Sequence, residues 1–234
     1  MNKRQIVLAV LAASALGSAA VLAQGQGGGG AAGGRGNAAP PPPMGFFITS
    51  TVPHTGKLGG LAGADKICQD LATAAGAGNR TWHAYLSQEA VNGVPAINAR
   101  DRIGPGPWYN ASGVIVANNV DELHGDTQRD RNNIKKQISL TEKKEIVNGF
   151  GDMPNEHDML TGSDSDGKAF TDGMDHTCKN WTSDSPMDHA MLGHSDRNGG
   201  NNTSWNAAHM SMGCDVMGLI RTGGSGRFYC FATN

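Results

Sequence analysis

Four carboxylates in one short polar segment of this sequence could together hold a cation. Asp164, Asp166, Asp172 and Asp175 lie on either side of Gly167, a residue that permits a sharp turn. Calcium takes about six to eight oxygen ligands from carboxylates, amides and carbonyls. Calcium is therefore the candidate cofactor of this segment, and the alternative is a solvated turn, which Asp and Gly form without metal.

Methionine and histidine alternate further along the chain and indicate a second kind of metal chemistry. Eight of the ten methionines fall between Met153 and Met217. Histidines are interleaved with them in the runs Met174-Asp175-His176, Met187 to Met191, His194, and His209 to Met212. Thioether and imidazole groups together suit copper, above all Cu(I). The alternative is that methionine fills irregular gaps in a loop-rich core.

Groups capable of acid–base catalysis are abundant, but they follow no pattern of a known reaction. Glu156, His157 and Asp158 place two carboxylates beside an imidazole. Nothing in the spacing defines a nucleophile, a base and a group that orients the base. The sequence also lacks the Gly-x-Ser-x-Gly and His-Glu-x-x-His motifs. We therefore expect a binding protein and assign no catalytic residue.

One tryptophan in a polar stretch is the best candidate for direct contact with a ligand. Trp205 is accompanied by the amides of Asn201, Asn202 and Asn206. An exposed indole offers an apolar face and one hydrogen-bond donor, and amide side chains both donate and accept. These four residues are the predicted ligand-binding set, for a sugar or for another protein.

The N-terminus has the charge and hydropathy pattern of a secretory signal peptide. Lys3 and Arg4 precede an apolar run from Ile6 to Leu16, and Val21-Leu22-Ala23 offers a cleavage site. We expect residues 1–23 to be removed on export, and the alternative is an uncleaved N-terminal anchor. The predicted location is secreted, periplasmic or cell-surface associated, with no transmembrane segment after cleavage.

A flexible tether then separates the signal peptide from the folded part. Sixteen of the twenty residues at 24–43 are Gly, Ala or Pro, a composition that cannot build a core. Residues 44–234 have the size of one domain. They carry 16 basic and 21 acidic residues, a net charge of −5. No basic patch with interleaved aromatic residues is present, so nucleic acid is not an expected partner.

Periodicity and cysteine content predict a disulfide-stapled α+β domain. We expect strands at 45–50, 82–87, 114–116 and 226–232, a helix at 62–75, an irregular helix within 120–149 and a long loop at 151–213. The four cysteines, an even number in an exported chain, predict two disulfides. Spacing alone leaves three pairings open.

The ordered set of these pieces resembles the C-type-lectin-like fold, and more closely the bacterial relatives of the collagen-derived endostatin domain. The matching pieces are Gly63-Ala64-Asp65 before the Cys68 helix, WHAYLS at 82–87, VANNVDEL at 116–123, LTG at 160–162, TCKNWTS at 177–183 and FYCF at 228–231. No single motif is diagnostic, and their order along residues 46–232 carries the likeness. The resemblance implies two helices around twisted antiparallel sheets with a long loop region.

The resemblance also implies a disulfide pairing and a type of ligand. It pairs the first cysteine with the last, Cys68 with Cys230, and Cys178 with Cys214. Sugar-binding members of this fold hold calcium with Glu-Pro-Asn and Trp-Asn-Asp motifs, from which this chain departs at Met153-Pro154-Asn155 and Trp205-Asn206-Ala207.

The sequence therefore predicts an exported lectin-like binding or adhesion module. We expect it to recognise a glycan or an extracellular protein through residues 151–213. The alternative is a periplasmic or extracellular protein that binds calcium or copper. An enzyme is the least favoured hypothesis.

Overall fold

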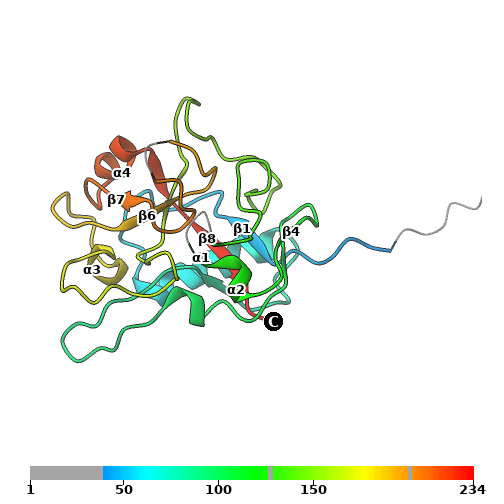
Figure 1. Ribbon diagram of the computed structural model, residues 1–234, viewed down its shortest axis with the longest axis horizontal. Helices are drawn as coiled ribbons and strands as arrows, with labels where there is room; N and C mark the ends of the chain where they lie inside the picture. The colour runs from blue at the N-terminus through cyan, green and yellow to red at the C-terminus, as the bar shows by residue number, and fades with distance from the viewer. Residues whose placement is uncertain (1–38, 126–128, 200–201) are drawn as a thin grey trace, which may run out of the picture. The chain divides into compact units, whose positions relative to one another are not determined.

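Residues 39–125, 129–199 and 202–234 are described by a computed structural model, in which they form an α+β fold, as the sequence predicts (Figure 1). The expected signal peptide at 1–23 lies outside the described residues, as do residues 24–38 of the tether and Asn201. No helix in the described ranges is long and apolar enough to cross a membrane.

The sheet is organised around the last strand, β8 (Gly224–Ala232), which contains the aromatic run expected at 226–232. β1 (Phe46–Ile48) and β2 (Trp82–Ala84) flank the C-terminal half of β8, and both run antiparallel to it. Cys230 is consequently opposite Phe47 on one side and opposite Ala84 on the other. The backbone of this half of β8 is therefore paired on both edges.

The N-terminal half of β8 pairs with a second set of short strands. β5 (Asp158–Leu160) runs parallel to it. β6 (Met191–His194) and β7 (His209–Met210) extend the sheet beyond β5, and each is antiparallel to its neighbour. The described residues thus form one six-stranded sheet. A separate two-stranded sheet consists of β3 (Trp108–Tyr109) and β4 (Ile115–Ala117).

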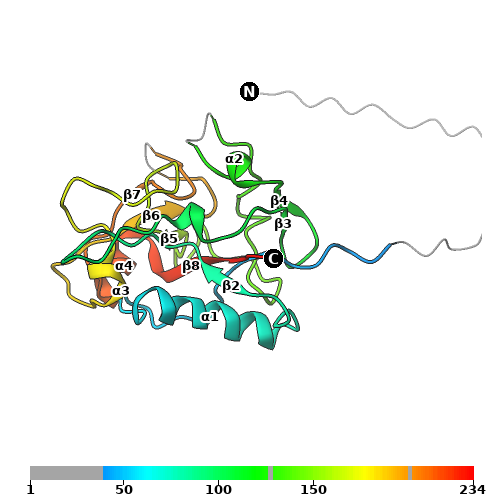
Figure 2. The same ribbon diagram turned by 90° about the horizontal axis from the view of Figure 1, so that it is seen from below.

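Both faces of β8 are buried because its side chains alternate between two apolar clusters. Phe228 and Cys230 belong to the cluster that includes α1 (Gly60–Ala74), whereas Tyr229 and Phe231 belong to the other. Figure 2 shows α1 on one side of the sheet and the β3–β4 pair on the other. The core therefore lies on both sides of this strand.

The helix α1 forms where the sequence predicts a helix at 62–75. Leu61, Ala64, Cys68 and Ala72 recur at helical spacing and are its buried residues. Asp65 then fixes the helix to β2, because its carboxylate accepts a hydrogen bond from the backbone N–H of Ala84 at 2.9 Å. The other oxygen of Asp65 pairs with Arg102 at 2.6 Å.

The remaining helices are short, and each begins at a side-chain cap. Asn119 caps α2 (Val120–Leu123), Thr177 caps α3 (Cys178–Trp181), and Asp215 caps α4 (Val216–Thr222). A single 3-10 turn spans Ala99–Asp101.

The element α3 is a left-handed turn. Cys178, Lys179, Asn180 and Trp181 have φ values of 48°, 54°, 53° and 64°. None of them is glycine, and the left-handed conformation costs a residue with a Cβ roughly 1–2 kcal/mol. The surrounding contacts therefore have to hold this turn in place.

Two disulfides staple the fold. Cys68 of α1 is bonded to Cys230 of β8, and Cys178 of the left-handed turn is bonded to Cys214. This is the pairing that the resemblance implies. Trp181 packs in the same cluster as the second bridge and donates its indole N–H to the Ser87 carbonyl at 2.7 Å.

Three expectations are corrected by the structure. The described residues contain the helices α1, α2 and α4 and the left-handed turn α3, where two helices were expected. The sheet is mixed, because β5 is parallel to β8. The segment at 151–213, expected as a loop, contains β5, α3, β6 and β7. These elements are two to four residues long, and their polar residues hide the alternation that identifies a strand in a sequence.

We predict that replacing Cys178 and Cys214 together by serine lowers the free energy of unfolding by about 2–5 kcal/mol, because the bridge restrains the unfolded chain. Chemical denaturation of the variant and of the parent measures the difference. The Cys68–Cys230 bridge remains in the variant and keeps the core closed. Equal stability of the two proteins would show that the left-handed turn does not depend on the bridge.

Candidate metal centre

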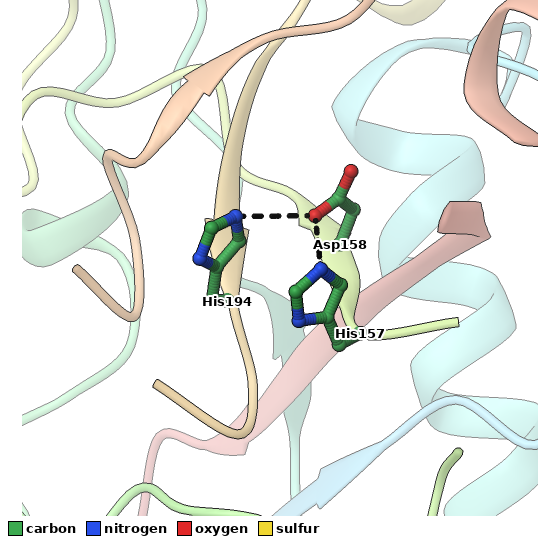
Figure 3. A group of neighbouring side chains, drawn as sticks. All are labelled: His157, Asp158 and His194. Atoms are coloured by element: carbon green, nitrogen blue, oxygen red, sulfur yellow. Dashed lines mark ion pairs between the residues drawn. The ribbon is translucent and has the colours of Figure 1, made fainter. Parts of the chain in front are cut away.

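Three buried side chains, His157, Asp158 and His194, converge at the end of the sheet (Figure 3). Each offers one possible ligand atom, and these atoms all lie within 4.8 Å of one another. Among the described residues, this is the one such group of three or more His, Cys, Asp or Glu side chains. Their side chains are at most 4% exposed.

Strand register brings these residues together. Asp158, the first residue of β5, lies opposite His194, the last residue of β6. Two residues further along, Leu160 lies opposite Leu192. Alternate residues of a strand point to the same face, so the Asp–His pair continues a face that is otherwise apolar. His157 directly precedes β5 and is not part of the strand's alternation; the contact of its Nδ1 with Asp196 turns its Nε2 toward Asp158.

Two glycines allow the backbone to pack closely around the group. A Cβ atom on Gly193 would lie 1.9 Å from the carbonyl oxygen of Trp205, so only glycine leaves room for that segment against β6. Gly223 has a φ of 113°, and its carbonyl accepts a hydrogen bond from the N–H of Asp158 at 3.2 Å. The start of β5 is thereby held next to the end of α4.

The polar atoms of the group are buried without hydrogen bonds. Both carboxylate oxygens of Asp158 and both ring nitrogens of His194 have no hydrogen-bond partner. The Nε2 atoms of His157 and His194 lie 3.3 Å and 3.4 Å from Asp158 Oδ1, within ion-pair distance but without hydrogen-bond geometry. A buried carboxylate without hydrogen bonds is costly, and paired charges or metal coordination relieve that cost. The donor set therefore fits a metal cation.

A second carboxylate orients His157. Its Nδ1 lies 2.9 Å from Asp196 Oδ1, which leaves Nε2 facing Asp158. Metal-binding histidines commonly donate their other N–H group to a carboxylate in this way. Burial by itself would raise the pKa of Asp196, but hydrogen bonds from His157 and from the backbone of Phe150 and Asn198 hold that pKa below its ordinary value. Asp196 is therefore an anion.

The electrostatic state of His194 also suits a ligand. The pKa of His194 is lowered to about 4, chiefly by burial; Asp158 opposes this shift, and the neighbouring His157 and His209 add to it. Its ring stacks on that of His157, with centroids 4.4 Å apart. The imidazole is neutral at pH 7 and retains a lone pair, which is the form that binds metal.

The carboxylates predicted to hold calcium form local turns instead of a shared group. Asp164 Oδ1 accepts from the backbone N–H groups of Asp166 and Lys168. Asp175 Oδ1 accepts from the N–H of Lys179, and Asp172 Oδ1 accepts from that of Met174. The structure does not gather the four carboxylates into one cluster of the described residues.

The predicted ligand-contact residues divide between the core and the surface. Trp205 and Asn206 are fully buried, which corrects the expectation that Trp205 is exposed to a ligand. Asn206 donates to the hydroxyl of Tyr85 at 3.0 Å, and the indole of Trp205 packs on the same ring. Asn202 is exposed and donates to the Ala207 carbonyl at 2.9 Å. Asn201 lies outside the described residues.

Methionine is mostly not a core residue in this region, in contrast to the interpretation that it fills gaps. Met153, Met174, Met187, Met212 and Met217 have exposed fractions between 51% and 92%. From the methionine-rich runs, His194 belongs to the candidate centre. The sequence indicated His157 and Asp158 as acid–base groups and His194 as a copper ligand. Their spacing in the sequence gives no sign that the three residues meet.

The family model described as a protein of unknown function (DUF1554) matches residues 51–199. This is more than half of the chain, and the chain belongs to that family. No curated protein matches it.

We predict that Trp205→Ala lowers the free energy of unfolding by about 3–5 kcal/mol, because the indole fills a closed part of the core. Thermal or chemical denaturation measures this loss. Asn202→Ala, on the adjacent surface, serves as the control and should cost no more than about 1 kcal/mol, because it loses only exposed or partly buried hydrogen bonds to the backbone. Similar stabilities for the two variants would contradict the buried position of Trp205.

Proposed function

We propose, from the geometry of the site, that this chain is an exported module that binds a divalent transition-metal ion between His157, Asp158 and His194. The observation that carries the proposal is the Asp158 carboxylate, which is buried with no hydrogen bond to either oxygen. A dication at this point would neutralise the carboxylate and use the lone pairs of the two imidazoles. The two disulfides support a location in an oxidising compartment outside the cytosol.

The donor set favours zinc over the two ions considered from the sequence. Two imidazoles and one carboxylate match the nitrogen and oxygen ligands of Zn²⁺. Calcium needs an all-oxygen shell, and Cu(I) prefers sulfur. Because Asp158 and His194 lie opposite each other on two strands, an ion bound between them would join β5 to β6.

We predict that the full chain binds one equivalent of Zn²⁺ in calorimetry, and that Asp158→Asn and His194→Ala each weaken binding by at least about 10-fold. Affinity should also fall as the pH is lowered, because protons compete with the ion for the imidazole nitrogens.

His189→Ala is the matched control. It removes an imidazole that contacts the Ser211 carbonyl outside the group, and it should bind zinc as the parent does. A parent protein without saturable zinc binding would refute the proposal, as would unchanged affinity in Asp158→Asn.

A second candidate function is the lectin-like binding of a glycan or an extracellular protein. It is supported by a cavity of about 540 Å³ between residues 89–96 and 170–180, the second of which belongs to the predicted binding region. Volumes of this order are typical of ligand sites. Asn180 joins the two walls, because its amide accepts from the N–H of Glu89 at 2.8 Å and donates to the carbonyl of Glu89 at 3.0 Å. The cavity is therefore pre-formed.

We predict that a glycan array probed with the full chain gives a signal that Ala96→Phe abolishes, because the phenyl ring fills the cavity that Ala96 lines. Thermal denaturation should show that the variant remains folded. The array is probed with and without calcium. Because the acidic residues do not form one calcium shell, the glycan signal should not depend on calcium. Absence of any glycan signal in either condition would remove glycans as the ligand and leave protein adhesion to be tested by binding assays.

A further inference from the structure

A third histidine approaches the same carboxylate oxygen from the more exposed side of the group. Nε2 of His209 lies 3.5 Å from Asp158 Oδ1, and its side chain is 39% exposed, whereas that of Asp158 is fully buried. We infer that His209 is the fourth ligand of the metal ion, and that the ion enters and leaves past this residue. The inference rests on the proposed zinc site and specifies its coordination and its route of exchange.

The distances around Asp158 Oδ1 carry the inference. The three Nε2 atoms of His157, His194 and His209 lie 3.3, 3.4 and 3.5 Å from this one oxygen. In a tetrahedral zinc centre with bond lengths of about 2.05 Å, neighbouring ligand atoms are about 3.3–3.4 Å apart. Each imidazole nitrogen is thus at the distance from the carboxylate oxygen that such a centre requires. His209 is not among the three residues whose ligand atoms all lie within 4.8 Å of one another, so its ring turns inward to complete the centre.

Strand register explains why His209 arrives there. His209, the first residue of β7, lies opposite Leu192 of β6, and Leu192 is two residues before His194. Residues two apart on a strand share a face, so His209 and His194 are diagonal neighbours on the face that Asp158 occupies. Their rings meet edge to face, with centroids 5.0 Å apart.

Hydrogen bonds at Nδ1 leave the Nε2 atoms of His209 and His157 facing Asp158. Nδ1 of His209 lies 3.1 Å from the carbonyl of Met210, just as Nδ1 of His157 is occupied by Asp196. A carbonyl accepts only from a protonated nitrogen, so Nδ1–H of His209 leaves Nε2 to face Asp158. This tautomer is the one in which Nε2 can bind a metal.

The difference in exposure among the ligands indicates the route of exchange. His157, Asp158 and His194 are covered by protein, and β7 is a two-residue strand with one paired neighbour in the sheet. Rotation of His209 away from the group would uncover the ion without moving β5 or β6. Three neutral imidazoles and one carboxylate leave a net charge of +1 on the bound centre.

The test uses Co²⁺ in place of zinc, because four-coordinate Co²⁺ absorbs visible light far more strongly than five- or six-coordinate Co²⁺. The full chain should show the intense tetrahedral spectrum with one equivalent of Co²⁺. His209→Gly should still bind the ion, lose most of that intensity, and release the ion to a chelator about 10- to 100-fold faster. Added free imidazole should restore the spectrum, because it fills the vacated coordination position. His189→Ala should behave as the parent does.

The outcomes separate this inference from the proposed function. If His209→Gly keeps the tetrahedral spectrum and the parent's rate of release, His209 is no ligand and only the three-residue site stands. If the parent binds neither Co²⁺ nor Zn²⁺, the proposed function and this inference both fail. Loss of intensity without rescue by imidazole would also overturn the inference, because it would show that His209 acts through the fold.

Discussion

Pairing of β8 on both of its edges is the constraint on which the rest of this structure depends. Its C-terminal half is held between β1 and β2, and its N-terminal half is paired with β5. Cys230 adds a covalent bond from the same strand to α1. Because β5 takes its position from β8, the location of Asp158, and with it the whole candidate centre, follows from this pairing. The aromatic residues of β8 make the arrangement stable, since they enter the apolar clusters on both faces.

At the candidate centre, the side chains on this face of the sheet change from apolar to polar. Leu160 and Leu192 face each other within the apolar cluster, and the next pair along the same face is Asp158 and His194. A polar pair without hydrogen bonds at this depth opposes folding. Natural sequences accept such a cost where function requires it. The hydrogen bond from His157 to Asp196 shows that a neighbouring residue also holds one member of the group in its orientation.

The second disulfide serves a different local purpose from the first. The first joins a helix and a strand that are already packed together. The second holds Cys178, the first residue of a left-handed turn of four non-glycine residues. Asn180, within that turn, forms the paired hydrogen bonds that fix one wall of the cavity to Glu89. Strained backbone conformations occur most often at active sites and ligand-binding sites.

Long, regular features were predictable from the sequence alone. The helix at α1, the aromatic strand at β8 and the α+β class follow from periodicity, which acts between residues close in the chain. The candidate centre was not predictable in the same way. His157, Asp158, His194 and His209 each occur in a polar stretch that has no strand pattern of its own. The buried side chain of Trp205 was likewise hidden by its polar neighbours in the sequence.

Only the tertiary structure decided which of the many acidic and histidine side chains meet. Asp164 and Asp175 are close in sequence, yet each caps its own turn. Asp158 and His194 are distant in sequence, yet β5 and β6 place them opposite each other. The physical reason is that short polar strands form because β8 and the core provide partners, and not from any propensity of their own. The sequence by itself determined the elements that build the scaffold, and the register of the sheet determined the site.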